Sequence, residues 1–353
     1  MFNYFLRLAA PLFFLTISAA ALSAQNNAYK IAAIGFYNLE NLFDTIKSPD
    51  TNDQEYLPAG RLKWNTAKYV SKQRNMANVI TQLATERTPD GVAILGVAEI
   101  ENRKVLEDLV AEPELKDRNY QIVHYESPDP RGIDCAFLYN PAYFRLVGSK
   151  AVAVPMIDPT TGDRRTSRDI IYMAGEFDGE LIHLMVGHWP SRRGGEKNTA
   201  WARMACARKC RELSDSICAV QPGAKIFIMG DLNDDPSSKS LIEGLKALKS
   251  TKELNEDCDL YNPMYAMYKD GNGTLAYRDA WSLFDQIIIS RPLVDKEAGG
   301  WQMHRAVVFR QPWLLQAGGA FAGYPFRTFV GDAFINGYSD HLPVYLFLLK
   351  KME

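Results

Sequence analysis

The chain has 353 residues, a length that allows one large domain or two average ones. Hydrophobic residues make up 47% of it and charged residues 23%, a balance that excludes a disordered protein. The formal net charge of −2 excludes a protein that coats nucleic acid through a basic surface, so any site for a polyanion has to be a local patch.

The first 25 residues are predicted to be a secretory signal peptide. Residues 2–23 contain a single charge, Arg7, in a run rich in Leu, Phe and Ala, and small residues follow at positions 19–21 and 23–24. An uncleaved N-terminal anchor is the alternative. No later segment approaches the roughly 20 apolar residues that a membrane span needs. We therefore expect a secreted or periplasmic protein with no stable membrane insertion.

Residues 26–353 contain no internal repeat or linker, and we expect one catalytic domain. Strand-like and helix-like segments alternate along it, which favours an α/β fold with two mixed β-sheets packed together and flanked by helices. Two long loops, residues 44–63 and 291–338, are expected to have a function because loops of this length are uncommon. Strands are predicted at residues 30–38, 91–99, 120–125, 134–139, 181–188, 224–229, 284–290 and 343–349, and helices at residues 64–85, 104–109, 198–220 and 238–248.

Acidic and amide side chains follow two predicted strands in the first third of the chain. Asn38 and Glu40 flank one apolar residue, so both can face a common site, although such a pair alone is more typical of a turn. Glu99 ends a strongly apolar strand, where a carboxylate is costly unless it is paired, for example with Arg103, or bound to a metal. Magnesium prefers one or two protein carboxylates together with waters and substrate phosphate.

Candidate phosphate-binding groups lie in two loops of the middle of the chain. Arg131 lies in a loop containing Pro and Gly, and His188 directly follows a strand. Arg192 and Arg193 come next, and guanidinium groups suit phosphate because they donate in a planar fork. The helix at residues 198–220 carries four more basic residues, which form either a basic patch or a solvated helix face.

The most informative stretch is residues 226–236. An apolar run predicts a buried strand, and Gly230 allows the backbone to turn at its end. Asp231 and Asn233 follow two apart, which places their side chains on one side of an extended backbone. A carboxylate and an amide in this position can orient a water and hold a phosphate.

A second informative phrase lies near the C-terminus. Asp340 and His341 come just before an apolar strand, so an acid stands beside an imidazole. Asp285 opens another strand and is a candidate for the carboxylate that fixes the tautomer and orientation of His341. The alternative for Asp285 is an acid at a strand edge that faces water.

Taken in order, these phrases resemble those of the endonuclease/exonuclease/phosphatase superfamily. That family includes deoxyribonuclease I, repair nucleases, sphingomyelinases and inositol polyphosphate 5-phosphatases, and the resemblance covers about residues 30–350. It implies a four-layer α/β sandwich of the deoxyribonuclease I type. The family often has Asn at the position of Gly187. The contact with the phosphate that this Asn side chain would make is therefore not supplied by Gly187. The matching phrases are residues 37–40, Glu99, His188 with Ser191, residues 230–233, residues 284–285 and residues 339–341.

The resemblance also implies roles for single residues. Glu99 corresponds to the main magnesium carboxylate. The residues implied near the ion or its waters are Asn38, Glu40 and Asp340. Asp231 and His341 are implied to prepare the attacking water. Asn233 and His188 are implied to donate to the scissile phosphate, and Asp285 is implied to orient His341.

We therefore expect an exported phosphodiesterase that depends on Mg²⁺, with Mn²⁺ or Ca²⁺ as alternatives, and that cleaves DNA by in-line attack of water. An alternative with the same chemistry is a phosphatase or phospholipase C-like enzyme acting on inositol phosphates or phospholipid headgroups. In the first case the aromatic residues of the loop at residues 291–338 stack on bases, and in the second they contact a membrane or shape the substrate site. A noncatalytic binding protein is a third alternative, but every family motif that carries an ionisable residue has that residue in this chain. No protein partner is implied.

Overall fold

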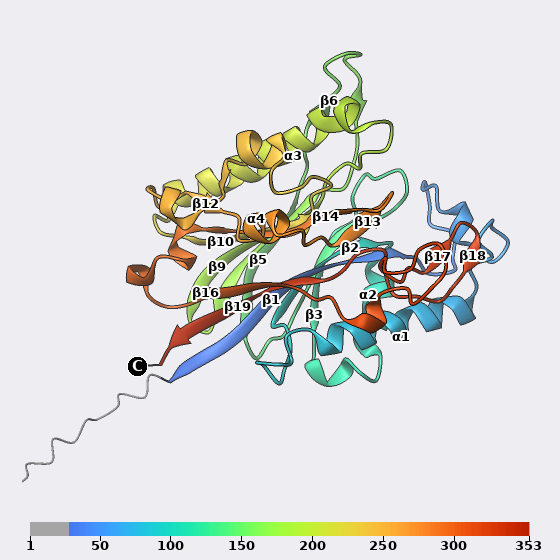
Figure 1. Cartoon of the computed structure of the whole chain (residues 1–353), viewed down its shortest axis with the longest axis horizontal. Helices are drawn as coiled ribbons and strands as arrows, with labels where there is room; N and C mark the ends of the chain where they lie inside the picture. The colour runs from blue at the N-terminus through green and yellow to red at the C-terminus, as the bar shows by residue number, and fades with distance from the viewer. Residues whose placement is uncertain (1–27, 353) are drawn as a thin grey trace, which may run out of the picture.

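Residues 28–352 are described by the computed structural model of the chain, and the predicted signal peptide lies outside them (Figure 1). Two large β-sheets pack face to face, and helices cover their outer faces. The six-stranded sheet has the order β16-β19-β1-β2-β4-β3 and the seven-stranded sheet the order β11-β12-β15-β10-β9-β8-β5. The predicted fold class is confirmed.

The strands of the six-stranded sheet are β1 (Tyr29–Leu42), β2 (Ile94–Ile100), β3 (Gln121–His124), β4 (Asp134–Tyr139), β16 (Gln302–Val308) and β19 (Val344–Lys351). Those of the seven-stranded sheet are β5 (Phe144–Val152), β8 (Ile170–Phe177), β9 (Glu180–His188), β10 (Lys225–Asp231), β11 (Ala247–Leu248), β12 (Leu260–Tyr261) and β15 (Asp285–Ser290). Three small hairpins join β6 (Met156–Ile157) to β7 (Arg164–Arg165), β13 (Leu275–Tyr277) to β14 (Ala280–Ser282), and β17 (Phe329–Val330) to β18 (Ala333–Phe334).

Helices α1 (Thr66–Gln82) and α2 (Arg103–Ala111) cover the six-stranded sheet, and α3 (Glu196–Val220) covers the seven-stranded sheet (Figure 1). The short helix α4 spans Met264–Lys269. Asn65 and Asn102 cap the N-termini of α1 and α2 by accepting a hydrogen bond from the backbone N–H three residues on. Cys218, at the end of α3, is bonded to Cys258 in the loop before β12.

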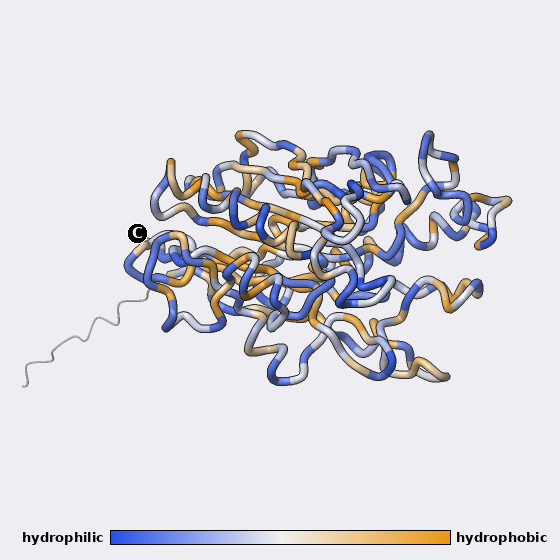
Figure 2. Tube along the Cα trace, turned by 90° about the horizontal axis from the view of Figure 1, so that it is seen from above, coloured by the Kyte–Doolittle hydropathy of each residue, from blue (hydrophilic) through white to orange (hydrophobic). Residues whose placement is uncertain are grey.

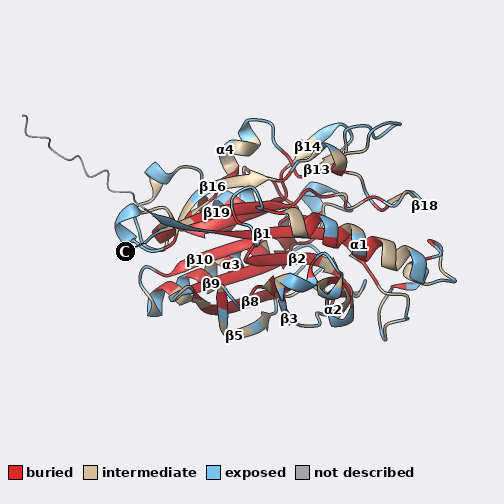
Figure 3. Cartoon of the chain, turned by 90° about the horizontal axis from the view of Figure 1, so that it is seen from below, coloured by how far each residue is buried: buried red, intermediate tan, exposed pale blue. Residues whose placement is uncertain are grey.

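The strands are buried because successive side chains enter different cores. In β1, Ile34 and Phe36 pack between the two sheets, whereas Ala33 and Tyr37 face the helical layer of α1 and α2. A third core lies between the seven-stranded sheet and α3. Burying a side chain such as Phe36 contributes about 1.5–3 kcal/mol. Apolar residues accordingly gather inside the molecule (Figure 2), and the central strands are buried along most of their length (Figure 3).

Two sequence-based predictions of secondary structure differ from the structure. The helix predicted at residues 238–248 is a single π-helical turn, Ser240–Gly244, after which Lys246 takes a left-handed φ of 58° and the chain enters β11. The predicted long loop at residues 291–338 contains β16, an edge strand whose half-exposed side chains carry little periodic signal. Among residues 28–352, no helix combines the length and the apolar character that crossing a bilayer requires.

Candidate active site

The carboxyl ends of parallel strands from both sheets meet at one edge of the sandwich. β1 runs parallel to β2, and β9 runs parallel to β10. Asp231, the last residue of β10, lies opposite His188 of β9 and opposite Asp285 at the start of antiparallel β15. His341 comes shortly before β19, whose first residue pairs with Phe36 of β1. Strand register therefore brings the predicted catalytic side chains to one place.

Gly230 allows β9 and β10 to approach closely just below this edge. A Cβ atom at Gly230 would lie only 1.9 Å from the carbonyl oxygen of Gly187, so no larger residue fits. Gly187 itself has space for a Cβ, with the indole nitrogen of Trp189 as its nearest neighbour at 3.4 Å. The glycine at 187 is therefore not required by packing in the way that Gly230 is.

The carboxylate of Asp231 is the centre of the site. Its Oδ2 accepts a hydrogen bond from Asn38 Nδ2 at 3.1 Å and lies 3.4 Å from His188 Nε2. The same oxygen is 3.7 Å from His341 Nε2. Its other oxygen, Oδ1, accepts a hydrogen bond from the backbone N–H of Asn233 at 3.0 Å. Asp231 thus links both histidines and fixes the turn that follows β10.

His341 and Asp285 form a buried pair on one side of Asp231. His341 Nδ1 lies 2.7 Å from Asp285 Oδ2, and Asp285 has no exposed surface. Burial lowers the pKa of His341, but Asp285 and Asp231 outweigh it and hold the pKa well above its usual value. Burial raises the pKa of Asp231 to about 7, with His341 opposing the rise and Asp285 reinforcing it. Asp231 can therefore hold and release a proton near neutral pH, next to an imidazole that two carboxylates keep protonated.

His188 is neutral, in contrast to His341. Burial, followed by the positive charges of Arg168 and Arg131, holds the pKa of His188 well below its usual value. Its Nε2 lies 3.4 Å from Asp231 and 3.8 Å from Glu99 Oε1. Because carboxylates are the neighbours of Nε2, that nitrogen carries the proton, and His188 can donate a hydrogen bond to an oxygen of a substrate.

Glu99 reaches the site through irregular backbone. The pairing of β2 with β4 shifts between Ala98 and Ile100, so Glu99 occupies a β-bulge, and its φ is 60°. Glu40 and Asn233 also have left-handed φ values of 49°. Such a conformation costs about 1–2 kcal/mol for a residue with a side chain. Bulges re-aim side chains beside active sites, and backbone strain collects there.

Glu99 and Asn38 have the chemistry to hold a hard divalent cation. Glu99 Oε2 accepts a hydrogen bond from the backbone N–H of Asn41 at 3.0 Å, whereas within residues 28–352 its Oε1 accepts none. The side chain of Glu99 is 14% exposed, so this oxygen is open to solvent. Asn38 adds an amide oxygen whose one donor in the described part of the chain is the backbone N–H of Glu40, at 2.9 Å. One carboxylate and one carbonyl oxygen with room for water match what magnesium prefers.

Asp231, Asp285 and His341 also lie close enough together to share a cation. We assign the cation to Glu99 instead, because Asp285 and His341 are bonded directly to each other and Asp285 is fully buried. An ion between them would have to break that bond, and with it the orientation of the imidazole.

Glu40 and Asp340 are held by the segment that precedes β19. Arg327 bridges them, with Nε 3.2 Å from Glu40 Oε1 and Nη2 2.7 Å from Asp340 Oδ2. The backbone N–H of Thr328 donates to Glu40 Oε2 at 2.7 Å, and the buried Lys72 lies 3.8 Å from the same oxygen. Burial and Asp340 raise the pKa of Glu40 to about 7. Burial also acts to raise the pKa of Asp340, but the positive charges of Arg327, His341 and Lys72 together outweigh it and lower that pKa, so Asp340 stays ionised. Asp340 is thus the better metal ligand of the two, and Glu40 anchors the segment.

The structure separates the three arginines that the sequence assigned to substrate binding. Arg131 Nη2 lies 3.8 Å from Glu99 Oε2, so Arg131 borders the site. Arg192 instead donates to the backbone carbonyl of Asn233 at 2.9 Å and lies 3.1 Å from Asp234. Arg193 is exposed, and its side chain forms no hydrogen bond or ion pair within the described chain. Of the three, Arg131 borders the site through its contact with Glu99, whereas Arg192 is held by the turn after β10.

Arg192 and Asn233 instead organise the turn after β10. The guanidinium of Arg192 stacks 4.5 Å above the ring of Phe284 while it pairs with Asp234. The side-chain amide of Asn233 donates to the carbonyl of Trp189 at 2.9 Å, which leaves one of its two N–H groups for a ligand. The predicted donor role of Asn233 is compatible with this geometry, and Arg192 holds the residue in place.

Arg168, which no sequence pattern indicated, holds the backbone of His188 in place. Its guanidinium pairs with the buried Asp129 at 2.9 Å and donates to the carbonyls of His188 at 3.1 Å and Trp189 at 3.0 Å. Asp129 belongs to the loop that carries Arg131. Arg168 therefore fastens two walls of the site together. No motif could have revealed it, because its partners lie 20 and more residues away in the chain.

Three of the basic residues of α3, interpreted from the sequence as either a basic patch or a solvated helix face, are paired with acids of the protein. Arg203 is fully buried and pairs with Asp234 at 2.8 Å. Farther along, Lys209 pairs with Glu212 and Arg211 pairs with its neighbour one turn on. The positive charges of this helix are therefore largely balanced by the protein itself.

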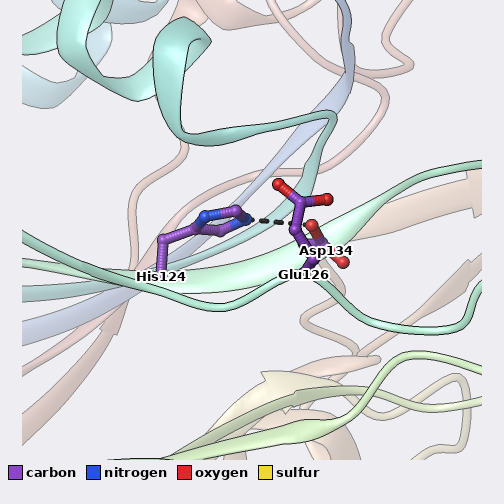
Figure 4. Close-up of side chains that lie close together, drawn as sticks. All are labelled: His124, Glu126 and Asp134. Carbon is purple, nitrogen blue, oxygen red and sulfur yellow. Dashed lines mark hydrogen bonds and ion pairs between the residues drawn. The ribbon is translucent and has the colours of Figure 1, made fainter. Parts of the chain in front are cut away.

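A second cluster of ionisable side chains lies outside the active site, at the base of the loop after β3. His124 Nε2 is 2.9 Å from Asp134 Oδ2, with Glu126 beside them (Figure 4). Asp134 also accepts a hydrogen bond from the backbone N–H of Ser127 at 2.9 Å. These contacts tie the two ends of the Arg131 loop together, and the ring nitrogen that would face an ion is already bonded to Asp134.

Comparison with known proteins agrees with the fold. The sequence profile described as Endonuclease/Exonuclease/phosphatase family matches residues 33–350. No curated protein matches the chain.

Three solved structures illustrate the similarity. An endonuclease/exonuclease/phosphatase family protein from Bacteroides thetaiotaomicron is 16% identical with a TM-score of 0.55, covering 92% of this chain and 97% of its own. A mannosyl-6-phosphatase from the same species is 16% identical with a TM-score of 0.53, covering 90% and 99%. D. rerio TDP2, solved with a single-strand DNA product, is 13% identical with a TM-score of 0.53, covering 90% and 98%. At these identities the likeness concerns the fold.

Proposed function

Because the chain belongs to the endonuclease/exonuclease/phosphatase family, and is thus a metal-dependent phosphoric ester hydrolase, we propose that it is an exported phosphodiesterase that cleaves DNA. The observation that carries the chemistry is the set of contacts around Asp231. A buried Asp285–His341 pair lies on one side of this carboxylate, and the neutral His188 and the open Glu99 lie on the other.

The residues divide the reaction between proton transfer and charge stabilisation. Asp231 and His341 act together as the base: Asp231, whose pKa lies near 7, takes the proton of the attacking water, and Asp285 holds the imidazolium of His341 beside it. His188 and the remaining N–H of Asn233 donate to oxygens of the phosphate as negative charge develops there. Asp231, His341, Asp285 and Asn233 are fixed by buried hydrogen bonds before substrate arrives, so little reorganisation of these four is needed.

Glu99, with Asn38 and Asp340, would hold the divalent cation, with Mg²⁺ as the preferred ion and Mn²⁺ or Ca²⁺ as alternatives. When bound, such an ion neutralises charge on phosphate oxygens. Arg131 adds a guanidinium at the rim, near Glu99, where it can contact the same phosphate or the next one.

Two observations support export and a DNA substrate. Disulfides such as the one between Cys218 and Cys258 persist mainly in oxidising compartments, which agrees with the predicted signal peptide. D. rerio TDP2, which has a similar fold, was solved with a single-strand DNA product, so a protein of this fold can bind single-strand DNA. The α3 surface is a weaker candidate for DNA binding, because Arg203, Lys209 and Arg211 are paired with acids of the protein.

Cleavage of supercoiled plasmid by the mature protein, with magnesium and with chelator, tests the proposal. We expect metal-dependent nicking that His341→Ala abolishes. His304→Ala is the matched control, because His304 is an exposed histidine of β16 outside the site. Full nicking activity in His341→Ala would refute the assignment of the base. Nicking that persists in chelator would refute the metal dependence.

A phosphatase or phospholipase C-like activity is the second candidate. It is favoured by the similar fold of the B. thetaiotaomicron mannosyl-6-phosphatase, since a small phosphoester would use the same side chains. Absence of plasmid nicking, together with metal-dependent release of inorganic phosphate from sugar phosphates or inositol phosphates, would move the assignment to this candidate.

A further inference from the structure

A cavity of about 450 Å³ opens directly beside the active site. The turn between β13 and β14 forms one wall, and residues 316–331 form the other. Arg327 and Asp340 also line it, so the cavity shares a boundary with the proposed metal ligands. Because Asp340 belongs both to the cavity lining and to the proposed metal site, the cavity is placed to take a group attached to a phosphate held at that site. Its volume is that of a site for one small ligand rather than of an extended groove.

Aromatic side chains are exposed around the cavity, against the usual preference for burial. Tyr277 is 66% exposed and Phe321 is 40% exposed. The ring of Phe321 lies 5.6 Å from that of Tyr324 at an angle of 64°. Exposed rings that line one cavity provide flat apolar surfaces on which a planar ligand can stack.

The other aromatic residues of the long segment are not available for this purpose. Trp301 is buried and packs against Phe177 at the far end of the sheets. Trp313 and Phe326 both pack against the ring of Tyr338. The aromatic stacking surface predicted for residues 291–338 is thus reduced to Phe321 and Tyr324, and Tyr277 joins them from another part of the chain.

The turn that carries Tyr277 is strained and held from across the cavity. Arg278 and Asp279 have φ values of 49° and 63° in a two-residue hairpin turn, where Asn-Gly is preferred. Tyr324 Oη accepts the backbone N–H of Asp279 at 2.6 Å and donates to its carboxylate at 2.8 Å. Arg278 is exposed, lies 5.3 Å from the Tyr277 ring centre, and forms no ion pair within residues 28–352. Strain of this kind persists where a side chain is needed in a set position.

We propose that this cavity is a nucleoside site, in which the base next to the scissile phosphate leaves its stack and lies against Tyr277 and Phe321. Arg278 contacts the phosphate on the far side of that nucleoside. Aromatic platforms combined with an unpaired cation are how proteins hold single-stranded nucleic acid. A choline headgroup would also pack against aromatic rings, but the positive charge of Arg278 disfavours it. The assignment rests on the proposed phosphodiesterase function and names its substrate class as single-stranded or frayed DNA.

Two chromogenic diesters with the same leaving group test the site. Thymidine 5′-(p-nitrophenyl phosphate) carries a nucleoside, and methyl p-nitrophenyl phosphate does not. We expect the wild-type enzyme to prefer the thymidine ester in kcat/KM, and the double variant Tyr277→Ala/Phe321→Ala to lower that preference about tenfold. Tyr29→Ala is the matched control, because Tyr29 is 48% exposed at the opposite end of β1.

A binding measurement separates stacking from catalysis. An oligonucleotide containing 2-aminopurine, mixed with the protein in chelator so that no cleavage occurs, should lose fluorescence when the base stacks. The loss should be smaller for the double variant than for Tyr29→Ala.

The outcomes distinguish the nucleoside site from the function on which it rests. Hydrolysis of neither ester with magnesium refutes the phosphodiesterase function, and the nucleoside site with it. Hydrolysis of both, with a preference and a fluorescence loss that do not depend on Tyr277 and Phe321, refutes the nucleoside site and leaves the phosphodiesterase function standing.

Discussion

Replacing Asp285 with Asn tests how much the buried carboxylate contributes to the reaction. The substitution keeps the shape of the side chain and removes one negative charge at 2.7 Å from His341 Nδ1. Asp285 Oδ1 has no hydrogen-bond partner among the described residues, so the amide displaces no existing bond there. The folded structure should therefore survive, while the imidazolium loses its stabilising partner.

The expected loss follows from the distance and the burial. A unit charge at about 4 Å from the centre of the imidazolium is worth about 4 kcal/mol at an effective dielectric constant of 20. Each 1.36 kcal/mol is a factor of ten in rate, so the variant should lose about three powers of ten in kcat. Asp231, at 3.7 Å from His341 Nε2, retains part of the charge, so the measured loss should lie between about 10² and 10³.

The assay is the magnesium-dependent hydrolysis of a chromogenic phosphodiester between pH 5 and 9, with thermal unfolding measured in parallel. Because Asp285 helps to raise the pKa of Asp231, the variant's acidic limb should also move to lower pH. Asp117→Asn, an exposed acid outside the site, is the control. A loss in kcat below tenfold, with an unchanged pH profile and an unchanged melting temperature, would refute the role assigned to Asp285.

Two further predictions concern stability. Arg168→Met leaves Asp129 buried and unpaired, so the free energy of unfolding in urea should fall by about 3–5 kcal/mol. Adding Asp129→Asn should recover most of that loss. A free energy of unfolding of Arg168→Met within about 1 kcal/mol of wild type would contradict the role of the Arg168–Asp129 pair. Burial raises the pKa of Glu101 to about 7, against hydrogen bonds from Ser48 and Asp44 that lower it. The protonated carboxyl group of Glu101 therefore contributes its full stability below pH 4.5, and that stability is lost as the pH rises through 7. Between pH 4.5 and pH 8, the free energy of unfolding of the metal-free wild type should fall by about 1–3 kcal/mol more than that of Glu101→Gln. Equal pH dependence of urea unfolding in both proteins would contradict this.

Part of the fold was predictable because some segments carry strong local patterns. The apolar runs that became β10 and β15, and the periodic segment that became α1, were placed correctly. β16 was missed because an edge strand exposes side chains on both faces and shows no alternation. The turn at Ser240–Gly244 was predicted as a helix because its composition is helical, and only packing against α3 limits it to one turn.

The same division holds for the active site. Asp231, Asp285 and His341 were identified because each ends or begins an apolar strand, where a charged side chain is unexpected. Arg168 and Arg327 were not identified, since nothing near them in the chain marks them. Arg192 was predicted to bind substrate because Arg-Arg-Gly-Gly suits phosphate, yet its donors are used by Asn233 and Asp234.

The sequence by itself determined which kinds of side chain stand at the ends of which strands, because strand periodicity and turn chemistry act over a few residues. It therefore specified the sandwich of two sheets and the order of the reactive phrases. Only the tertiary structure decided which of these groups touch. Asn38 and Asp231 are 193 residues apart in the chain and share a hydrogen bond because β1 and β10 pack across the core. Charge states, the open oxygen of Glu99 and the aromatic cavity depend on such distances and on burial, which no local pattern encodes.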